Sequence, residues 1–323
     1  MKQRFIFRAC LAGVLAACAA GATAAAYPEK PITLVIPFAA GGNNDISGRL
    51  IAKKMGDILG QAIVVENKTG AAGAIGAAFV AQAKPDGYTL GFLSSGPLAA
   101  NMSLYKSLAY DSLKDFAPVA RTTTSPSVLV ANPSVPADDL KSFVDYLKKH
   151  PNKVNYGTSG NGSSPHLAAA LFESMADVKM INVPYRGGSQ VNTDLLGGQI
   201  QISFSPILEA VPLVQSKKLK AFAVTSATRS DLLPDVPALA ESYPGYEVLT
   251  WNGIVAPAGT PADRIARLNA AAVQAVGSPD VVERLKQLGL QPAPSDSQGF
   301  GRYIEQEIKH FAKLLRLAGV EPQ

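Results

Sequence analysis

Two glycine-rich turns hold the residues whose types and spacing are best suited to bind an anion. The first reads Ala39-Ala40-Gly41-Gly42-Asn43, and the second contains Thr158-Ser159-Gly160-Asn161-Gly162. Each lies between the carboxyl end of a predicted strand and the amino end of a predicted helix, where open α/β sheets bind their ligands. Glycine lets the backbone approach a ligand closely, and free N–H groups together with the helix dipole attract negative charge. The turns therefore predict an anion site, against the alternatives of ordinary tight turns or flexible linkers.

Five further side chains stand at predicted strand ends or helix starts and can add to this site. Ser94 and Ser95 end one strand and Ser205 ends another, with solvated turns or helix capping as the alternative to ligand contact. Arg186 follows a strand, and its guanidinium can form a fork with a second carboxylate, although most arginines lie on solvated surfaces. His166 opens the helix after the second turn, where we expect it to hydrogen-bond the turn beside the ligand rather than act as a base.

The same loops contain no recognisable catalytic motif. A nucleophile elbow needs Gly-x-Ser-x-Gly, but the sequence from Gly157 places Asn161 at the last position. A dinucleotide motif begun at Gly160 fails at Pro165, and no cluster of residues has metal-ligand spacing. We therefore predict a binding protein without catalytic residues, metal or cofactor, with an exported hydrolase and a scaffold or adhesion protein as the alternatives.

The amino terminus has the pattern of an export signal. Residues 1–26 combine a basic start, an apolar stretch at 9–20 and a small-residue cleavage site at Ala24-Ala25-Ala26, which predicts a mature chain beginning near Tyr27. The apolar stretch is shorter than the ~20 residues that span a bilayer. Leu15-Ala16-Ala17-Cys18 also resembles a lipobox, so lipid anchoring at Cys18 is an alternative route. Ordinary cleavage would remove both cysteines and exclude disulfides.

Composition and charge limit the class of protein further. The chain of 323 residues is 47% hydrophobic and 17% charged, which predicts a folded protein of two domains because the length exceeds what one core usually serves. Its net charge of +5 includes Lys2, Arg4 and Arg8 in the predicted signal, which leaves roughly +2 without a long basic run. We therefore expect no nucleic-acid partner, and beyond residue 26 no apolar stretch reaches spanning length.

Alternating strand and helix patterns must position the two turns. Residues 32–38 form a nearly continuous apolar run, typical of a strand buried on both faces, and an amphipathic helix follows over 46–59. Asp45 and Arg49 on this helix are four apart and are expected to pair. The alternation repeats to residue 225, which predicts doubly wound parallel sheets.

The order of elements predicts that the chain leaves the first domain and later returns to it. A Pro-rich stretch at 233–245 interrupts the pattern, and strong core helices follow it. We expect domain 1 to comprise 27–124 plus 250–323 and domain 2 to comprise 125–249. The two crossings, near 122–126 and 246–251, would form a hinge.

Motifs in this order along the whole mature chain resemble those of the Bug family, the receptors of tripartite tricarboxylate transporters. The matching segments include Ile36-Pro37-Phe38 with Gly41-Gly42, Pro85-Asp86-Gly87-Tyr88, Val183-Pro184-Tyr185-Arg186-Gly187, Asp194-Leu195-Leu196-Gly197-Gly198-Gln199, and Ala256-Pro257-Ala258-Gly259-Thr260-Pro261. The resemblance implies an α/β, type II periplasmic-binding-protein fold, with two doubly wound domains joined by a two-crossing hinge. It also implies a periplasmic location.

The resemblance further implies how the site works and what partners the protein has. Turns matching Phe38 to Asn43 and Thr158 to Gly162 act as pincers in that family, and they hold a ligand carboxylate through amides, hydroxyls and waters. Family ligands are di- and tricarboxylates, acidic amino acids and aromatic carboxylates. The implied partners are a multi-span membrane permease and a small accessory membrane protein, with a sensor kinase as the alternative, and the receptor is expected to be a monomer. Relatives often carry Asp where this chain has Ser205, which should alter what the distal end of the ligand meets.

Overall fold

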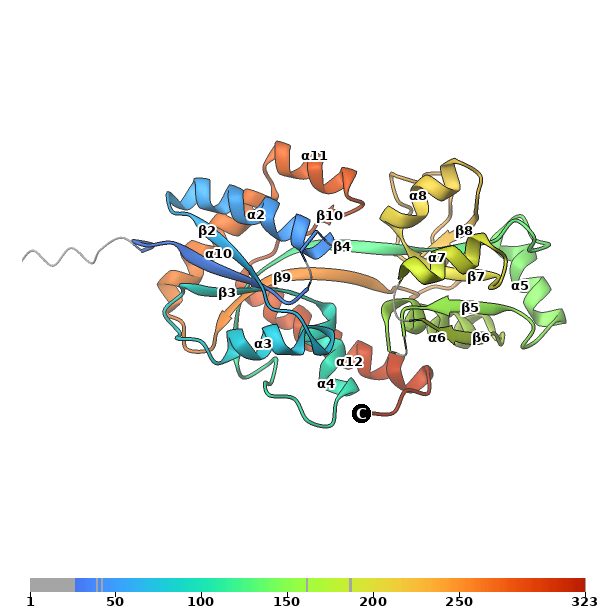
Figure 1. Ribbon diagram of the computed structural model, residues 1–323, viewed down its shortest axis with the longest axis horizontal. Coiled ribbons are helices and arrows are strands. Elements are labelled where there is room, and N and C mark those ends of the chain that lie inside the picture. Colours follow the sequence, from blue (N-terminus) through green and yellow to red (C-terminus); the bar gives the residue numbers. More distant parts are fainter. Residues whose placement is uncertain (1–26, 39, 42, 161, 186–187, 323) are drawn as a thin grey trace, which may run out of the picture.

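The computed structural model describes residues 27–322 apart from 39, 42, 161, 186 and 187. The predicted signal with Cys18 lies outside the described residues, and so do the predicted site residues Ala39, Gly42, Asn161 and Arg186. Figure 1 shows an elongated molecule with a group of helices and strands at each end of the paired strands β4 (Phe116–Ala131) and β9 (Leu249–Pro257). We call the group that contains the amino-terminal strand the first lobe and the other the second lobe.

The first lobe is a sheet of order β2-β1-β3-β9-β4 with helices on both faces. Strand β1 (Ile32–Ile36) pairs in parallel with β2 (Ile63–Asn67) and β3 (Thr89–Ser94), whereas β9 is antiparallel to β3 and β4. Ile32, Leu34 and Ile36 belong to one core and Val35 to another, so burial on both faces explains the continuous apolar run. The helices and short elements of this lobe are α2 (Asn43–Leu59), a 3₁₀ turn (Ala71–Gly73), α3 (Ala74–Ala81), a π-helical turn (Gly96–Ala100), α4 (Asn101–Leu104), α10 (Ala262–Val276), α11 (Pro279–Gln287), β10 (Gln291–Pro292) and α12 (Ser297–Leu317).

The second lobe continues the sheet in the order β4-β7-β5-β6, and β8 also pairs with β4. Strands β5 and β7 are parallel neighbours, while β7 and β8 run antiparallel to β4. Phe143, Phe172 and Phe204 pack in one core, and Val191 and Ile207 pack in another. The elements are α5 (Leu140–Lys149), β5 (Asn155–Thr158), α6 (Ser164–Ala176), β6 (Ile181–Pro184), α7 (Gly188–Leu196), β7 (Ile202–Pro206), α8 (Ile207–Gln215), β8 (Lys220–Val224) and α9 (Leu239–Ser242).

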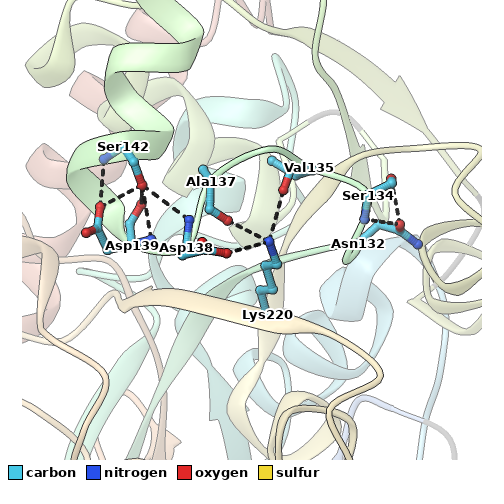
Figure 2. Close-up of polar contacts among 8 residues, drawn as sticks. All are labelled: Asn132, Ser134, Val135, Ala137, Asp138, Asp139, Ser142 and Lys220. Carbon is cyan, nitrogen blue, oxygen red and sulfur yellow. Dashed lines mark hydrogen bonds and ion pairs between the residues drawn. The ribbon is translucent and has the colours of Figure 1, made fainter.

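Polar contacts fix the loop that leads from β4 into α5 (Figure 2). The Asp139 carboxylate accepts a hydrogen bond from the Ser142 backbone N–H at 2.7 Å, and the Ser142 Oγ accepts one from the Asp139 N–H at 3.2 Å. This reciprocal capping satisfies donors that the first helical turn leaves unpaired. The Lys220 ammonium on β8 donates to the Val135 and Ala137 carbonyls at 3.1 and 2.8 Å, so the loop is held against the sheet.

The crossing from the first lobe to the second lies inside one long strand. β4 pairs with β9 from Phe116 to Pro126, with β7 from Ser127 to Ala131 and with β8 from Val128 to Ala131. The predicted crossing near 122–126 falls inside this strand, because the ladder hydrogen bonds to β9 continue as far as Pro126. The predicted domain limits at 124/125 and 249/250 fall within β4 and at the start of β9, and the division itself stays a prediction.

The predicted α/β class is confirmed, with a mixed rather than purely parallel sheet. The parallel pairs are β1 with β2 and β3, and β5 with β6 and β7. The returning strand β9 adds the antiparallel pairings in the middle. Within the part of the chain that the structure describes, no helix has both the length and the apolar character needed to cross a membrane.

Candidate functional site

The first turn lies beside the end of β3, because β1 and β3 are parallel neighbours whose carboxyl ends meet at one sheet edge. Gly73 sits between the two segments: a Cβ added there would lie 2.7 Å from Pro97 Cγ and 3.3 Å from Phe38 Cζ. Phe38, the Gly73 backbone and Pro97 therefore pack together at this edge.

A buried carboxylate holds the first turn in place. Asp45, on the first turn of α2, accepts hydrogen bonds from Gly41 N at 2.9 Å, Arg49 Nε at 2.9 Å and Asn67 Nδ2 at 2.9 Å. Asn67 Nδ2 also donates to the Phe38 carbonyl at 2.9 Å. The predicted pairing of Asp45 with Arg49 is confirmed. Asp45 and Asn67 hold the backbone of the turn in place, because Asp45 binds the Gly41 N–H and Asn67 binds the Phe38 carbonyl.

The hydrogen bonds at Asp45 decide its charge. Burial alone would raise the pKa of this carboxyl, but the bonds from Arg49, Gly41 and Asn67 outweigh burial and lower the pKa to about 2. Only 5% of the side chain is exposed. Hydrogen bonds to the ionised form favour ionisation, so Asp45 is an anion at neutral pH. It also cancels the charge of the one cation, Arg49, that contacts it.

The strained turn at 70–73, which lies next to Phe38, was not predicted from the sequence. Gly70, Ala71, Ala72 and Gly73 have φ of 127°, 45°, 49° and 89°. Alanine pays a steric cost in this left-handed region, and such strain is concentrated at functional sites. The Gly-Ala-Ala-Gly pattern shows the glycines, but nothing in the sequence shows that the two alanines share their conformation.

Ser94 and Ser95 are not solvated turn residues, which was the alternative to a role in the site. They are 5% and 3% exposed, at the end of β3 and the start of the π-helical turn. Across the ladder from Ser94 lies Asn252, whose Oδ1 is buried without a hydrogen-bond partner among the described residues. This part of the first lobe is therefore polar and almost closed to solvent.

The second turn is held by neutral groups rather than by an ion pair. The buried Thr158 hydroxyl donates to Asn182 Oδ1 at 3.0 Å, and the Ser163 hydroxyl donates to the Gly160 carbonyl at 2.6 Å. Gly160 and Gly162 have φ of 109° and 76°, which other residues rarely adopt. Ser159 is exposed, so its hydroxyl is available at the turn's surface.

His166 fastens the second turn to the start of α6, as we expected. Its Nδ1 accepts a hydrogen bond from the Gly162 N–H at 3.0 Å, and its ring stacks on Tyr156. Burial lowers the pKa of His166, because desolvation disfavours the charged ring. A neutral ring that accepts at Nδ1 carries its proton on Nε2, so His166 has a positioning role here.

A cavity of about 260 Å³ opens beside the second turn. It lies at the carboxyl ends of β5 and β7 and at the amino ends of α6, α7 and α8, the place expected for a ligand in an α/β sheet. Of the predicted site residues, Ser159 and Ser205 line it. Its other polar walls come from Ser164, Asn192, Ser203, Glu209 and Thr250.

Two serines on β7 differ in how their hydroxyls are satisfied. The Ser203 hydroxyl donates to the Gly157 carbonyl at 3.0 Å. The Ser205 hydroxyl is buried without a partner among the described residues, although Ser205 lines the cavity. The helix-capping alternative for Ser205 is not observed, since the cap of α8 is Pro206 without a side-chain hydrogen bond. A buried unpaired hydroxyl costs free energy unless something binds it.

The structure brings the second turn against the first lobe, but not the first turn into this cavity. A Cβ added at Gly162 would lie 3.0 Å from Leu104 Cδ1 and 3.5 Å from Leu315 Cδ2. Thr250 on β9 also donates to Ser164 at 3.5 Å. The predicted residues that do not line the cavity, though the structure describes their side chains or backbone, are Phe38, Ala40, Gly41, Ser94, Ser95, Thr158, Gly160, Gly162 and His166.

Comparisons with known proteins agree with this architecture. Residues 48–320 match the family described as the tripartite tricarboxylate transporter family receptor. The protein BugT of Bordetella pertussis is 35% identical over 308 residues, which cover 94% of each chain. A solved structure from R. palustris with adipate is 33% identical, with a TM-score of 0.80, over 92% of this chain and 100% of the other.

A second solved structure, MatC from Rhodopseudomonas palustris with bound malate, is 35% identical, with a TM-score of 0.73, over 90% of this chain and 100% of the other. These similarities in sequence and in three dimensions extend over nearly the whole described chain, so the fold is that of the periplasmic binding proteins. The chain belongs to the tripartite tricarboxylate transporter receptors, the Bug family of periplasmic solute-binding proteins.

Proposed function

We propose that this protein captures a small carboxylate in the cleft between its two lobes and delivers it to a tripartite tricarboxylate-type permease with its small accessory membrane protein. The observation that carries the proposal is the cavity of about 260 Å³, whose wall contains the buried Ser205 hydroxyl, which has no hydrogen-bond partner among the described residues. Its volume suits a small ligand, since pockets for drug-sized molecules are larger. Solved relatives with bound adipate and malate support the carboxylate class.

The proposed mechanism is binding without turnover. One jaw is the first turn, Phe38 to Asn43, with Ser94 and Ser95; the other is the second turn, Thr158 to Gly162, with His166, Arg186 and Ser205. Domains 27–124 plus 250–323 and 125–249 close by bending β4 and β9. Closure would remove water, which strengthens hydrogen bonds from backbone amides and hydroxyls to the ligand carboxylate.

A calorimetric screen of the mature protein against carboxylates tests this function. A ligand present at ~100 times its dissociation constant should add about 2.7 kcal/mol to the free energy of unfolding, and the ligand should be recovered unchanged. Turnover of the ligand, or no stabilisation by any di- or tricarboxylate, acidic amino acid or aromatic carboxylate, would refute the proposal.

The mass of the exported protein distinguishes a mature chain that begins at a free Tyr27 from one that begins at a lipidated Cys18.

A substitution at Ser205 distinguishes a contact with the ligand from a purely structural role of its hydroxyl. We expect Ser205→Ala to leave the unfolding free energy of the ligand-free protein unchanged or to raise it by about 1 kcal/mol, because it removes an unpaired buried group. The same change should weaken ligand binding by about tenfold if one hydrogen bond is lost. Ser203→Ala is the matched control: its hydroxyl is paired with Gly157, so it should cost about 1 kcal/mol of stability. Urea unfolding and calorimetry give the two readouts, and unchanged affinity in Ser205→Ala would contradict the assignment.

A further inference from the structure

The charge in the cavity wall points to one property of the ligand beyond its carboxylate. Among the lining residues that the structure describes, Glu209 is the one that carries a charge. Its Oε2 accepts a hydrogen bond from Asn192 Nδ2 at 2.7 Å. Both residues line the cavity and come from different helices, α8 and α7. A carboxylate in this position repels a second carboxylate and attracts a cation.

Capping of its own helix does not explain the orientation of the Glu209 carboxylate. It is the third residue of α8, where a glutamate often bonds back to the N–H of the capping residue. The capping residue here is Pro206, which has no N–H to donate. The carboxylate instead lies across from α7, with Oε2 3.5 Å from the position that a Cβ on Gly188 would occupy. Its orientation is therefore set by the cavity wall.

Two other polar side chains that line the same cavity, Asn192 and Ser205, can accept hydrogen bonds. Asn192 uses its amide N–H toward Glu209, so its Oδ1 is the acceptor end of that side chain. Ser205 is 3% exposed, and its hydroxyl has no hydrogen-bond partner among the described residues. This hydroxyl can act as a second acceptor in the same wall. An ammonium group has three donors and no acceptor, so it matches a carboxylate, an amide oxygen and a hydroxyl.

We propose that Glu209, with Asn192 and Ser205, is a specificity subsite for a positively charged ammonium group, so that the ligand is an amino-acid-like zwitterion rather than a plain dicarboxylate. This inference rests on the proposed function, since the carboxylate of the same ligand is held by the glycine-rich turns. Glu209 is exposed in the ligand-free protein, and closure of the lobes over the cavity would strengthen its attraction for the ammonium group.

Matched pairs of ligands that differ only in an ammonium group test the subsite. We would measure binding of succinate against L-aspartate and of adipate against L-2-aminoadipate by calorimetry. The wild-type protein should bind the aminated member of a pair about five- to tenfold more tightly, the range of a partly desolvated ion pair. Glu209→Gln should abolish that preference, and Glu209→Asp should restore part of it. Glu283→Gln, an exposed glutamate on α11, is the control that should change nothing.

Each outcome decides the inference. Equal or tighter binding of the plain dicarboxylates, or an equal effect of Glu209→Gln on both members of a pair, would overturn the ammonium subsite and leave the carboxylate receptor intact. Failure of all four compounds to bind would overturn the subsite and, with the wider screen negative as well, the proposed function. Urea unfolding of each variant without ligand shows whether a loss of binding reflects a loss of fold.

Discussion

Replacing Asp45 by Asn should loosen the first turn and remove a pH-dependent part of the stability. The carboxylate is 5% exposed and accepts bonds from Gly41, Arg49 and Asn67. Asn keeps the shape but loses the charge, and its one amide oxygen replaces two carboxylate oxygens. Arg49, whose side chain is 48% exposed, can be solvated after the change, so the loss should fall on the backbone bond to Gly41.

The expected magnitude follows from the pKa of Asp45. Three hydrogen bonds overcome burial and lower this pKa from 3.8 to about 2. At 1.36 kcal/mol per pH unit, this is worth roughly 2 kcal/mol of stability at neutral pH. Because the folded pKa is the lower one, the contribution is complete above about pH 5 and is lost as the pH falls toward 2. About half of it should be gone at pH 3.

Urea unfolding at pH 7, 5 and 3 checks this prediction. Asp45→Asn should be less stable than wild type by about 2 kcal/mol at pH 7 and by about 1 kcal/mol at pH 3. Asp57→Asn is the control on the same helix, because Asp57 forms an exposed pair with Lys53 that is worth less than about 0.5 kcal/mol. A deficit in Asp45→Asn that stays constant from pH 7 to pH 3 would refute the electrostatic reasoning.

Two further predictions concern the strained turn and Glu307, a half-buried acid on α12. Ala72→Gly should raise the unfolding free energy by up to about 1 kcal/mol because glycine accepts a φ of 49°, whereas Ala78→Gly inside α3 should lower it by about 0.5–1 kcal/mol; urea unfolding that gave both the same sign would exclude strain at Ala72. Burial raises the pKa of Glu307 to about 6 although its carboxylate accepts a bond from Trp251, so wild-type stability should fall as the pH rises from 4.5 through 6. Glu307→Gln should therefore add about 1–2 kcal/mol at pH 8 and little at pH 4, and an equal gain at both would rule out ionisation as the cause.

The sequence predicted the parts of the fold that rest on local pattern. The apolar run at 32–38 and the three-to-four spacing after it correspond to β1 and α2, because burial on two faces and on one face leave different signatures. The pairing of Asp45 with Arg49 was predicted from a spacing of four residues and is present. The helix begins at Asn43, earlier than the apolar spacing indicated, since polar first-turn residues do not enter an apolar pattern.

Features that depend on distant partners were missed. The sequence indicated only a chain crossing near 122–126, yet this segment is part of strand β4, because β9, more than a hundred residues later, supplies its hydrogen bonds. Glu209 has no motif around it, and its place in a cavity wall depends on Asn192 of another helix. Ala71 and Ala72 have left-handed backbone conformations beside the closely packed Gly73, against their own preference.

The two turns are fixed by different forces, and the difference bears on how an anion would be held. The first turn depends on an ion pair whose charges cancel, and the second depends on a neutral histidine and hydroxyls. Neither set of fixing groups offers a net positive charge, so backbone N–H groups and helix dipoles, together with Arg186 of the proposed second jaw, are left to attract a carboxylate. A site that attracts the anion with dipoles contains no buried cation, so no cation must be solvated again when the lobes open and the ligand leaves. A receptor that must release its ligand benefits from this arrangement, and Glu209 then adds selectivity for an ammonium group without competing for the carboxylate.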